Sequence, residues 1–183
     1  MNGSKVVLRQ EDVKRVVEYN AQTGEMKYRP RPLEEFATLA AWKRYCTKYA
    51  GKPTPSGRGT YASVGVYGRS FGAHRVAWTY ANGEIGDGLE VDHINGNHGD
   101  NRLCNLRLAT VTENRLNVGT KRSNKTGIKG VYKLRDGEWI SQIRANGKHI
   151  YLGYFRTKGE AAVAYAKASI RYHGAFSSIL SRR

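Results

Sequence analysis

The sequence is short of cysteines, acidic residues and long apolar runs, and each shortage excludes a class of protein. Its two cysteines, Cys46 and Cys104, form no CxxC pair and cannot supply a disulfide framework, so we expect a reducing compartment. No stretch approaches the roughly 20 consecutive apolar residues of a membrane span. The first ten residues also lack the apolar core and cleavage site of a secretory signal. We therefore expect neither secretion nor a membrane partner.

The charge of the chain is one-sided. It carries 31 Lys and Arg against 15 Asp and Glu, which gives a formal net charge of +16. Residues 119–183 hold 14 of the basic residues and only 3 acidic ones. With 12 Tyr and 3 Trp, and no basic amphipathic helix, this balance favours a nucleic-acid partner over a membrane surface. A solvated basic surface is the alternative.

At about 150 residues per domain, the 183 residues predict one domain or two small ones. Apolar spacing predicts a helix over residues 8–20, a short strand at 25–28 and a second helix over 33–50. The alternation after Tyr61 predicts a β-hairpin that runs into a short helix. The predicted divisions are an N-terminal region with a possible DNA grip (1–60), a central module (61–119), a basic linker (120–126) and a C-terminal domain (127–183).

The central segment, residues 89–118, combines elements that could carry chemistry. LEVDH reads as a strand that ends at His93, a loop rich in Asn, Gly and Asp follows, and CNLRLA reads as a second strand. Thr110-Val111-Thr112-Glu113 has the form of a capping box, which predicts a helix over residues 111–118. Asn114 then lies in the first turn of that helix, beside the strand ends.

This strand–loop–strand–helix unit resembles the HNH nuclease family and its ββα-metal fold. Several fixed spacings carry the resemblance, which spans roughly residues 60–118. The matching residues are His74-Arg75-Val76-Ala77-Trp78, Asp92-His93-Ile94-Asn95-Gly96-Asn97, Asp100-Asn101-Arg102, Asn105-Leu106-Arg107 and Glu113-Asn114.

The residue types fit phosphodiester hydrolysis, and the resemblance implies the same roles. His93 is the candidate base, because a neutral imidazole accepts a proton near pH 7. Asp92 and Asn114 offer hard oxygens to one divalent ion, which favours Mg²⁺ or Mn²⁺ over Zn²⁺. Asn105, on the predicted second strand, is expected to hold the loop and orient His93. Taken singly, each of these residues also fits an ordinary turn, cap or surface position.

Residues 127–183 change character. Turn signals separate three predicted strands, at 127–133, 139–144 and 149–155. A capping box at Thr157-Lys158-Gly159-Glu160 and the stop at Gly174 delimit a helix. Its inward residues are expected to be Ala161, Ala164, Tyr165, Ala168 and Tyr172. Trp139, Tyr154 and Phe155 are assigned to the core rather than to ligand contacts.

This segment resembles the AP2/ERF DNA-binding domain along nearly its full length. The marks are Lys129-Gly130-Val131-Tyr132, Trp139, Gln142-Ile143-Arg144, Tyr151-Leu152-Gly153-Tyr154-Phe155 and Glu160-Ala161-Ala162-Ala164-Tyr165. The resemblance implies that the sheet enters the DNA major groove. The implied contacts are Lys129, Tyr132, Arg144, His149 and Tyr151, with Lys133 and Arg135 nearby. Several Arg and Trp contacts of the family are replaced here, so the target sequence stays open.

The expected fold is therefore α+β: an HNH module followed by a three-stranded antiparallel sheet packed on one helix. The expected function is a phage-type or homing-type endonuclease that acts on double-stranded DNA, as a monomer, in the cytoplasm of a bacterial host. A DNA-binding regulator or anti-defence protein with an inactive nuclease fold is the main alternative. An RNA-directed nuclease is a third.

Overall fold

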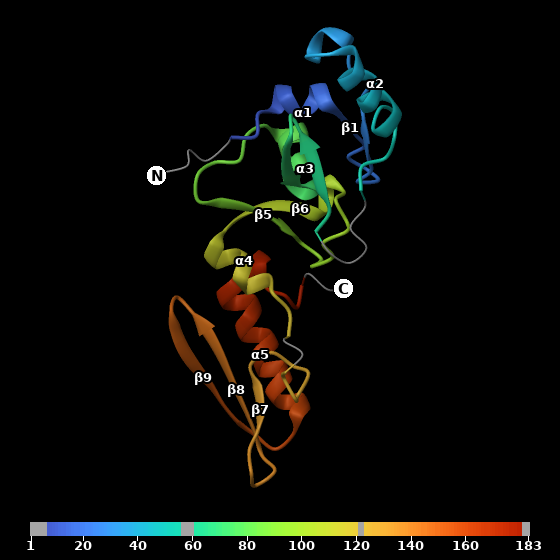
Figure 1. Ribbon diagram of the computed structural model, residues 1–183. Helices are drawn as coiled ribbons and strands as arrows, with labels where there is room; N and C mark the ends of the chain where they lie inside the picture. The colour runs from blue at the N-terminus through green and yellow to red at the C-terminus, as the bar shows by residue number, and fades with distance from the viewer. Residues whose placement is uncertain (1–6, 56–60, 121–122, 181–183) are drawn as a thin grey trace, which may run out of the picture. The chain divides into compact units, whose positions relative to one another are not determined.

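The computed structural model describes residues 7–55, 61–120 and 123–180. Residues 56–59 of the predicted basic loop and residues 121–122 of the predicted linker lie outside the described residues. The chain divides into two compact units, Met1–Thr110 and Val111–Arg183, and each is described here by itself. The mixture of helices and antiparallel sheets confirms the expected α+β class (Figure 1).

The first unit is built from three two-stranded sheets and three helices. Its elements are α1 (Gln10–Val16), β1 (Val17–Tyr19), β2 (Met26–Tyr28), the 3-10 turn η1 (Leu33–Glu35), α2 (Leu39–Lys48), β3 (Ser63–Val66), β4 (Arg69–Gly72), α3 (Ala73–Asn82), β5 (Leu89–His93), the 3-10 turn η2 (Leu103–Asn105) and β6 (Leu106–Thr110).

Its core is made largely of valines and tyrosines from α1, β1, β2, β3 and α3. Val13, Val64 and Val76 are fully buried in it, and α1 packs against α3. Burial of such side chains stabilises a fold by about 1.5–3 kcal/mol each. The hairpin β3–β4 and the helix α3 confirm the prediction made from the alternation after Tyr61.

The first predicted helix is wrong at its C-terminal end. The helix stops at Val16, and residues 17–19 form β1, which pairs antiparallel with β2. Val17 and Tyr19 are buried and Glu18 is exposed, which is the two-residue period of a strand. Apolar spacing alone did not separate the end of the helix from the start of this strand.

The second unit is a three-stranded antiparallel sheet, in the order β7-β8-β9, covered on one face by a long helix (Figure 1). Its elements are α4 (Val111–Asn117), β7 (Val131–Lys133), β8 (Trp139–Ala145), β9 (Lys148–Phe155), α5 (Lys158–His173) and the 3-10 turn η3 (Gly174–Phe176). The capping box at Thr157 and Glu160 is present as predicted, and α5 ends at Gly174.

Two details of this unit differ from the predictions. The strand expected over 127–133 begins only at Val131, because Gly127 and Gly130 have φ angles of +70° and +72°, outside the strand region. On α5, Tyr172 is 40% exposed rather than inward, and His173 is buried in its place. The inward face otherwise contains Ala161, Tyr165 and Ala168, as predicted.

Candidate functional site

The candidate catalytic pair lies at the end of β5. Antiparallel pairing with β6 places Asp92 opposite Arg107 and His93 opposite Leu106. Both side chains are buried: Asp92 is 7% exposed and His93 is 2% exposed. The strand that the LEVDH alternation predicted therefore holds these two neighbours at the start of the polar loop.

Arg107 fixes the carboxylate of Asp92. Its Nε and Nη2 donate hydrogen bonds to the same oxygen, Oδ2, at 2.9 and 2.8 Å. Hydrogen bonds between charged groups are shorter and stronger than neutral ones, so this pair restricts the rotamer of Asp92. Sequence reasoning quoted Arg107 in the motif but gave it no role.

The ring of His93 is held by Asn101 in the loop that follows. The His93 Nε2 lies 3.2 Å from the Asn101 Oδ1, and both residues are buried. An amide oxygen only accepts hydrogen bonds, so Nε2 carries the proton and Nδ1 keeps its lone pair. Burial lowers the pKa of His93, although the hydrogen bond that its ring donates to Asn101 acts in the opposite direction. The imidazole is therefore neutral near pH 7.

Three aromatic side chains surround His93. The rings of His74 and His98 lie 5.2 and 5.6 Å from it, measured between centroids. Tyr61 stacks on His98 at 4.0 Å, and its hydroxyl is 3.1 Å from the Nε2 of that ring. Burial, with smaller contributions from His93, Arg75 and His98, lowers the pKa of His74 to about 4.

Asn105 holds the loop, but from a different element than expected. It lies in the 3-10 turn η2, and β6 begins one residue later. Its Oδ1 accepts from the Asn95 backbone N–H at 3.0 Å, and its Nδ2 donates to the Asn95 Oδ1 at 3.0 Å and to the Asp100 carbonyl at 2.8 Å. Asn101, and not Asn105, hydrogen-bonds the His93 ring. A catalytic role for Asn105 stays a prediction.

The loop is also held by the N-terminal hairpin, a contact that sequence reasoning missed. The Tyr19 hydroxyl donates to the Asn101 carbonyl at 2.8 Å, and the Leu103 N–H donates to the Ala21 carbonyl at 2.9 Å. Gly24 lies so close that a Cβ there would be 2.7 Å from the Arg102 backbone nitrogen. The hairpin formed by β1 and β2 therefore supports Asn101, the residue that orients His93.

The second candidate metal ligand, Asn114, lies in α4 as predicted. Its meeting with Asp92 in one site stays a prediction, because the two residues belong to different compact units. Among the described residues there is no group of three or more His, Cys, Asp or Glu that could hold a metal ion. One carboxylate and one amide fit a hard cation that completes its shell with water and phosphate oxygens, as Mg²⁺ and Mn²⁺ do.

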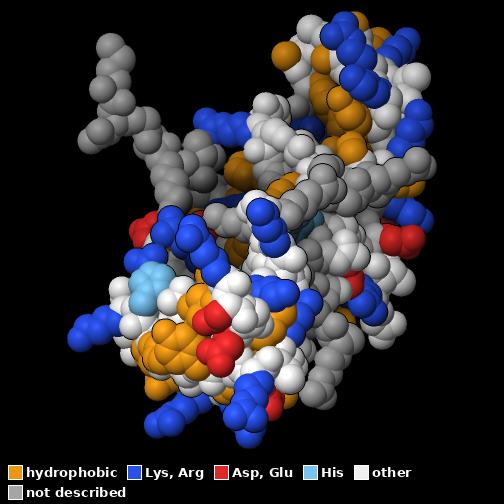
Figure 2. All heavy atoms as spheres, turned by 90° about the horizontal axis from the view of Figure 1, so that it is seen from below, with side chains coloured by type: hydrophobic (Ala, Val, Ile, Leu, Met, Phe, Trp, Pro, Cys, Tyr) orange, Lys and Arg blue, Asp and Glu red, His pale blue; other side chains and the backbone are white. Residues whose placement is uncertain are grey.

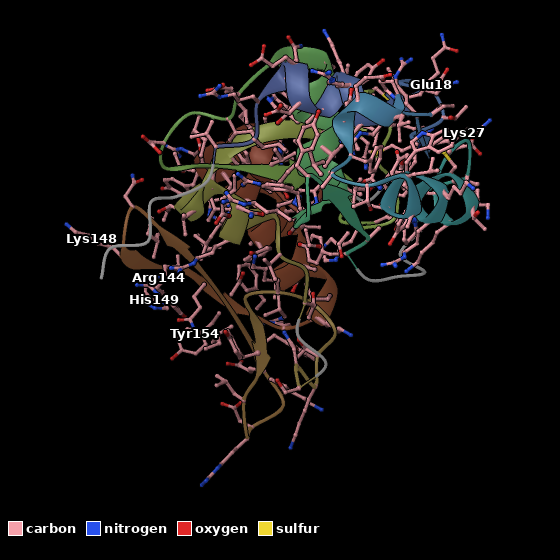
Figure 3. The ribbon with its side chains drawn as sticks, turned by 45° about the horizontal axis from the view of Figure 1, so that its top comes forward. Glu18, Lys27, Arg144, Lys148, His149 and Tyr154 are labelled. Atoms are coloured by element: carbon pink, nitrogen blue, oxygen red, sulfur yellow. The ribbon has the colours of Figure 1, made fainter. Side chains whose placement is uncertain are left out.

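The candidate DNA-binding residues divide between two faces of the C-terminal sheet. Tyr132, Arg144, His149 and Tyr151 are exposed on the face away from α5. Figure 3 labels Arg144 and His149 together with Tyr154, which the ladder places on this same face.

Three predicted contacts lie elsewhere. Lys133 pairs with Trp139 in the ladder, and its Nζ lies 5.9 Å from the centroid of the Trp139 ring, on the side of the inner residues. Arg135 is exposed in the turn between β7 and β8. The Lys129 Nζ donates to the carbonyls of Leu116 and Val118 at 3.0 and 2.9 Å, so the protein itself uses this ammonium group.

Tyr154 was assigned to the core, and this is wrong: it is 66% exposed. A β-bulge between Ser141 and Gln142 shifts the register, so that Tyr154 pairs with Ile140 on the outer face and Phe155 turns inward. Figure 2 shows a patch of hydrophobic side chains with Lys, Arg and His side chains near it and acidic side chains directly beside it.

Comparisons with known proteins identify the central segment. A family profile described as HNH endonuclease matches residues 71–116. Protein 3.8 of Escherichia phage T7 is 42% identical over 76 residues, which cover 41% of this chain and 63% of the phage protein. An uncharacterised HNH endonuclease of Acanthamoeba polyphaga mimivirus is 33% identical over 106 residues, 57% of this chain and 54% of the relative. Residues 71–116 are therefore an HNH endonuclease domain.

A third relative matches another kind of protein. An AP2/ERF and B3 domain-containing transcription factor of Arabidopsis thaliana is 47% identical over 49 residues, 27% of this chain and 14% of the plant protein. This chain spans less than two thirds of each of these relatives. No solved structure matches it. The helices of the described residues are all too short or too polar to cross a membrane.

Proposed function

We propose that this protein is a metal-dependent DNA endonuclease in which His93 activates the attacking water. The observation that carries the proposal is the arrangement of His93: a buried, neutral imidazole whose Nε2 is bonded to Asn101, directly after Asp92, within an HNH endonuclease domain. A fixed neutral imidazole next to a carboxylate is suited to remove a proton from water at a phosphodiester.

The chain's own residues divide the work. His93 accepts the proton at Nδ1, because Nε2 already donates to Asn101. Asn105 keeps the loop closed through its bonds to Asn95 and Asp100, which holds His93 and Asn101 in register. Asp92 and Asn114 would hold one Mg²⁺ or Mn²⁺ ion. When bound, such an ion supplies positive charge to the phosphate and the leaving oxygen.

The C-terminal unit is proposed to hold double-stranded DNA for the nuclease, in the manner of an AP2/ERF-like domain. Support comes from the excess of basic residues after position 119 and from the partial likeness to a plant AP2/ERF protein. Tyr132, Arg144, His149 and Tyr151 are the proposed contacts on the outer face of the sheet, with Lys133 and Arg135 at its edge. Lys129 is proposed to act through its bonds to the end of α4. Phosphate contacts of this kind make binding salt-dependent.

The phage and giant-virus relatives support a homing-type or phage HNH enzyme. We propose that it acts as a monomer in the cytoplasm of a bacterial host. One observation favours the alternative of a DNA-binding regulator or anti-defence protein with an inactive nuclease fold: Arg107 already neutralises Asp92 through two hydrogen bonds. In that alternative no cation competes with Arg107 for the carboxylate.

Conversion of supercoiled plasmid to nicked or linear DNA decides between the two. The nuclease proposal expects conversion with Mg²⁺ or Mn²⁺, none with EDTA, and its loss in Asp92→Ala. The Glu11→Ala variant is the matched control, because it removes an exposed carboxylate of α1 that has no role in the proposed site. Plasmid binding without any conversion by the wild-type protein, with either ion, would establish the regulator instead.

A further inference from the structure

We infer that the outer face of the C-terminal sheet binds an unpaired stretch of DNA strand by stacking bases on three tyrosines, Tyr132, Tyr151 and Tyr154. The inference rests on the proposed function in one respect, that DNA is the ligand. It departs from the proposed function in another respect: the ligand of this face is a melted or single-stranded segment, within or beside the duplex that the nuclease cuts, rather than the groove of the intact duplex.

The ladder brings the three rings together. Tyr132 on β7 pairs with Ile140 on β8, and Ile140 pairs in turn with Tyr154 on β9. Tyr151 lies opposite Gln142 on the same face. The ring centroids of Tyr151 and Tyr154 are 5.5 Å apart, at an interplanar angle of 67°. The three phenol rings thus lie on one face of the sheet, with Tyr151 and Tyr154 in contact and Ile140 between Tyr154 and Tyr132.

The hydrophobic core of this unit does not include these three rings. The inner face of the sheet has its own core, in which Val131 and Ile143 are buried together with Tyr165 of α5. Tyr132, Tyr151 and Tyr154, by contrast, are 44%, 52% and 66% exposed. A gathering of large exposed rings on one strand face marks an interaction surface more often than a structural need.

The charge around the rings fits a nucleic acid. The strands β7, β8 and β9 contain no Asp or Glu. At the hairpin end of the face, Arg144 lies opposite His149 in the ladder, and both are exposed. Lys148, also exposed, pairs with Ala145 beside the turn, and Figure 3 shows it at the same end of the hairpin. The face therefore offers cations for phosphates at one end and rings for bases at the other.

The basic surface continues on the far side of Tyr132. A cavity of about 730 Å³ lies there, within the second unit, and Arg115, Lys125, Tyr132 and Lys133 contribute to its lining. Among the described residues that line it there is no acidic side chain. Thr126, which lines the cavity, is fixed to β7 because its hydroxyl donates to the Val131 carbonyl at 2.8 Å. A strand that stacks on Tyr132 can therefore place its next phosphates against cations.

Stacking favours unpaired bases over a duplex for a geometric reason. In a duplex the faces of the bases are covered by their neighbours, and only the edges are open in the grooves. A tyrosine offers one hydroxyl, which cannot form the two-pronged contact that distinguishes base pairs. An unpaired base exposes its flat face, and every base has one. On this face only Gln142 and Arg144 can make two-pronged contacts, against three rings that can stack.

The experiment compares two forms of the same DNA. Full-length protein in EDTA is titrated into a labelled 20-nucleotide strand and into the matching duplex, and fluorescence anisotropy gives both dissociation constants. We expect the single strand to bind at least tenfold more tightly. Tyr132→Ala, Tyr151→Ala and Tyr154→Ala should each weaken it by roughly 5- to 150-fold, the range for one lost base stack. The corresponding Phe variants should keep wild-type affinity, since the ring remains.

Tyr172→Ala is the matched control, because this tyrosine is 40% exposed on α5 in the same unit. It should change neither affinity. The inference is overturned if the duplex binds more tightly and the Ala variants weaken both forms alike, which is groove binding. It is also overturned if no Ala variant changes the binding of the single strand, in which case the face serves another partner.

Failure of the proposed nuclease is distinguishable from failure of this inference. Tyrosine-dependent binding of the single strand by a protein that never nicks plasmid would discard the nuclease and keep the inference. Metal-dependent nicking by a protein whose strand binding ignores the tyrosines would do the reverse.

Discussion

His93 and Asn101 form a buried hydrogen bond, with the His93 Nε2 3.2 Å from the Asn101 Oδ1. The bond indicates which nitrogen of the imidazole carries the proton, because the amide oxygen accepts and Nε2 must donate. Asn101 is itself anchored through its backbone carbonyl, which accepts from the Tyr19 hydroxyl at 2.8 Å. Tyr19, in the N-terminal hairpin, is thus connected to the candidate base His93 through Asn101.

The first prediction concerns Asn101. Removing the acceptor in Asn101→Ala frees the ring to change tautomer, and we expect the rate constant of DNA cleavage to fall by roughly 10- to 100-fold. Asn101→Asp keeps an acceptor at the same place and should lose much less. KM should stay near its wild-type value in both variants. Equal rates for Asn101→Ala and the wild type would remove Asn101 from the account.

The second prediction concerns acid stability and His74. Burial chiefly, with His93, Arg75 and His98 nearby, lowers its pKa to about 4 from an ordinary value of 6.5. Between these values the unfolded chain binds a proton that the folded chain does not, so the free energy of unfolding falls as the pH falls. From pH 7 to pH 4.5 we expect His74 to account for up to roughly 2 kcal/mol of that fall.

Urea titrations of the wild type and His74→Gln at the two pH values measure this difference. The variant should lose less stability on acidification than the wild type. An identical loss in both proteins would show that His74 protonates equally well in the folded state.

The sequence predicted those helices and strands that local patterns determine. Alternation identified β5, and the capping box at Thr157 identified the start of α5. The sequence did not predict the orientation of Tyr154, because an extra residue in β9, between Tyr151 and Gly153, reverses the alternation near Gly153, whose φ is +131°. A period of two assigns Tyr154 to the core, and a single extra residue in the ladder exposes it.

The sequence predicted the residue types of the candidate site, but not the contacts that hold these residues in place. The spacing from Asp92 to Asn114 pointed to the HNH motif, and the HNH endonuclease profile covers these residues. The partner of His93 depends on how the loop folds. The sequence assigned Asn105 to orient His93, whereas Asn101 makes the hydrogen bond to its ring. The contact from Tyr19 joins residues 82 positions apart, which no local pattern encodes.

The third prediction tests this long-range support through Gly24. Its φ is +78°, and a Cβ there would meet backbone atoms of Asn101 and Arg102 at 2.8 and 2.7 Å. Gly68 has a similar φ of +76° but open space around it. We expect Gly24→Ala to lower the free energy of unfolding by at least about 1 kcal/mol more than Gly68→Ala does. Chemical denaturation of both variants gives the comparison; equal losses would mean that the hairpin does not press on the loop.

The fourth prediction concerns the cation. The proposed ligands, Asp92 and Asn114, present only oxygen atoms, so Mg²⁺ and Mn²⁺ should support cleavage and Zn²⁺ should not. Asn114→His adds a nitrogen ligand and should shift the preference toward softer ions, with Zn²⁺ now supporting measurable cleavage. Cleavage rates over a metal series provide the measurement. An unchanged metal preference in Asn114→His would place this residue outside the metal site.

The most direct test of the account is the single-turnover rate of plasmid cleavage with Mg²⁺ by the wild type, His93→Ala and His149→Ala. His149 is the matched control, an exposed histidine of the other unit. Loss of general-base catalysis predicts a rate 10²- to 10⁴-fold lower in His93→Ala, with His149→Ala cutting at close to the wild-type rate once saturated with DNA. A His93→Ala variant that cuts as fast as the wild type would contradict the assignment of the base, and with it the proposed mechanism.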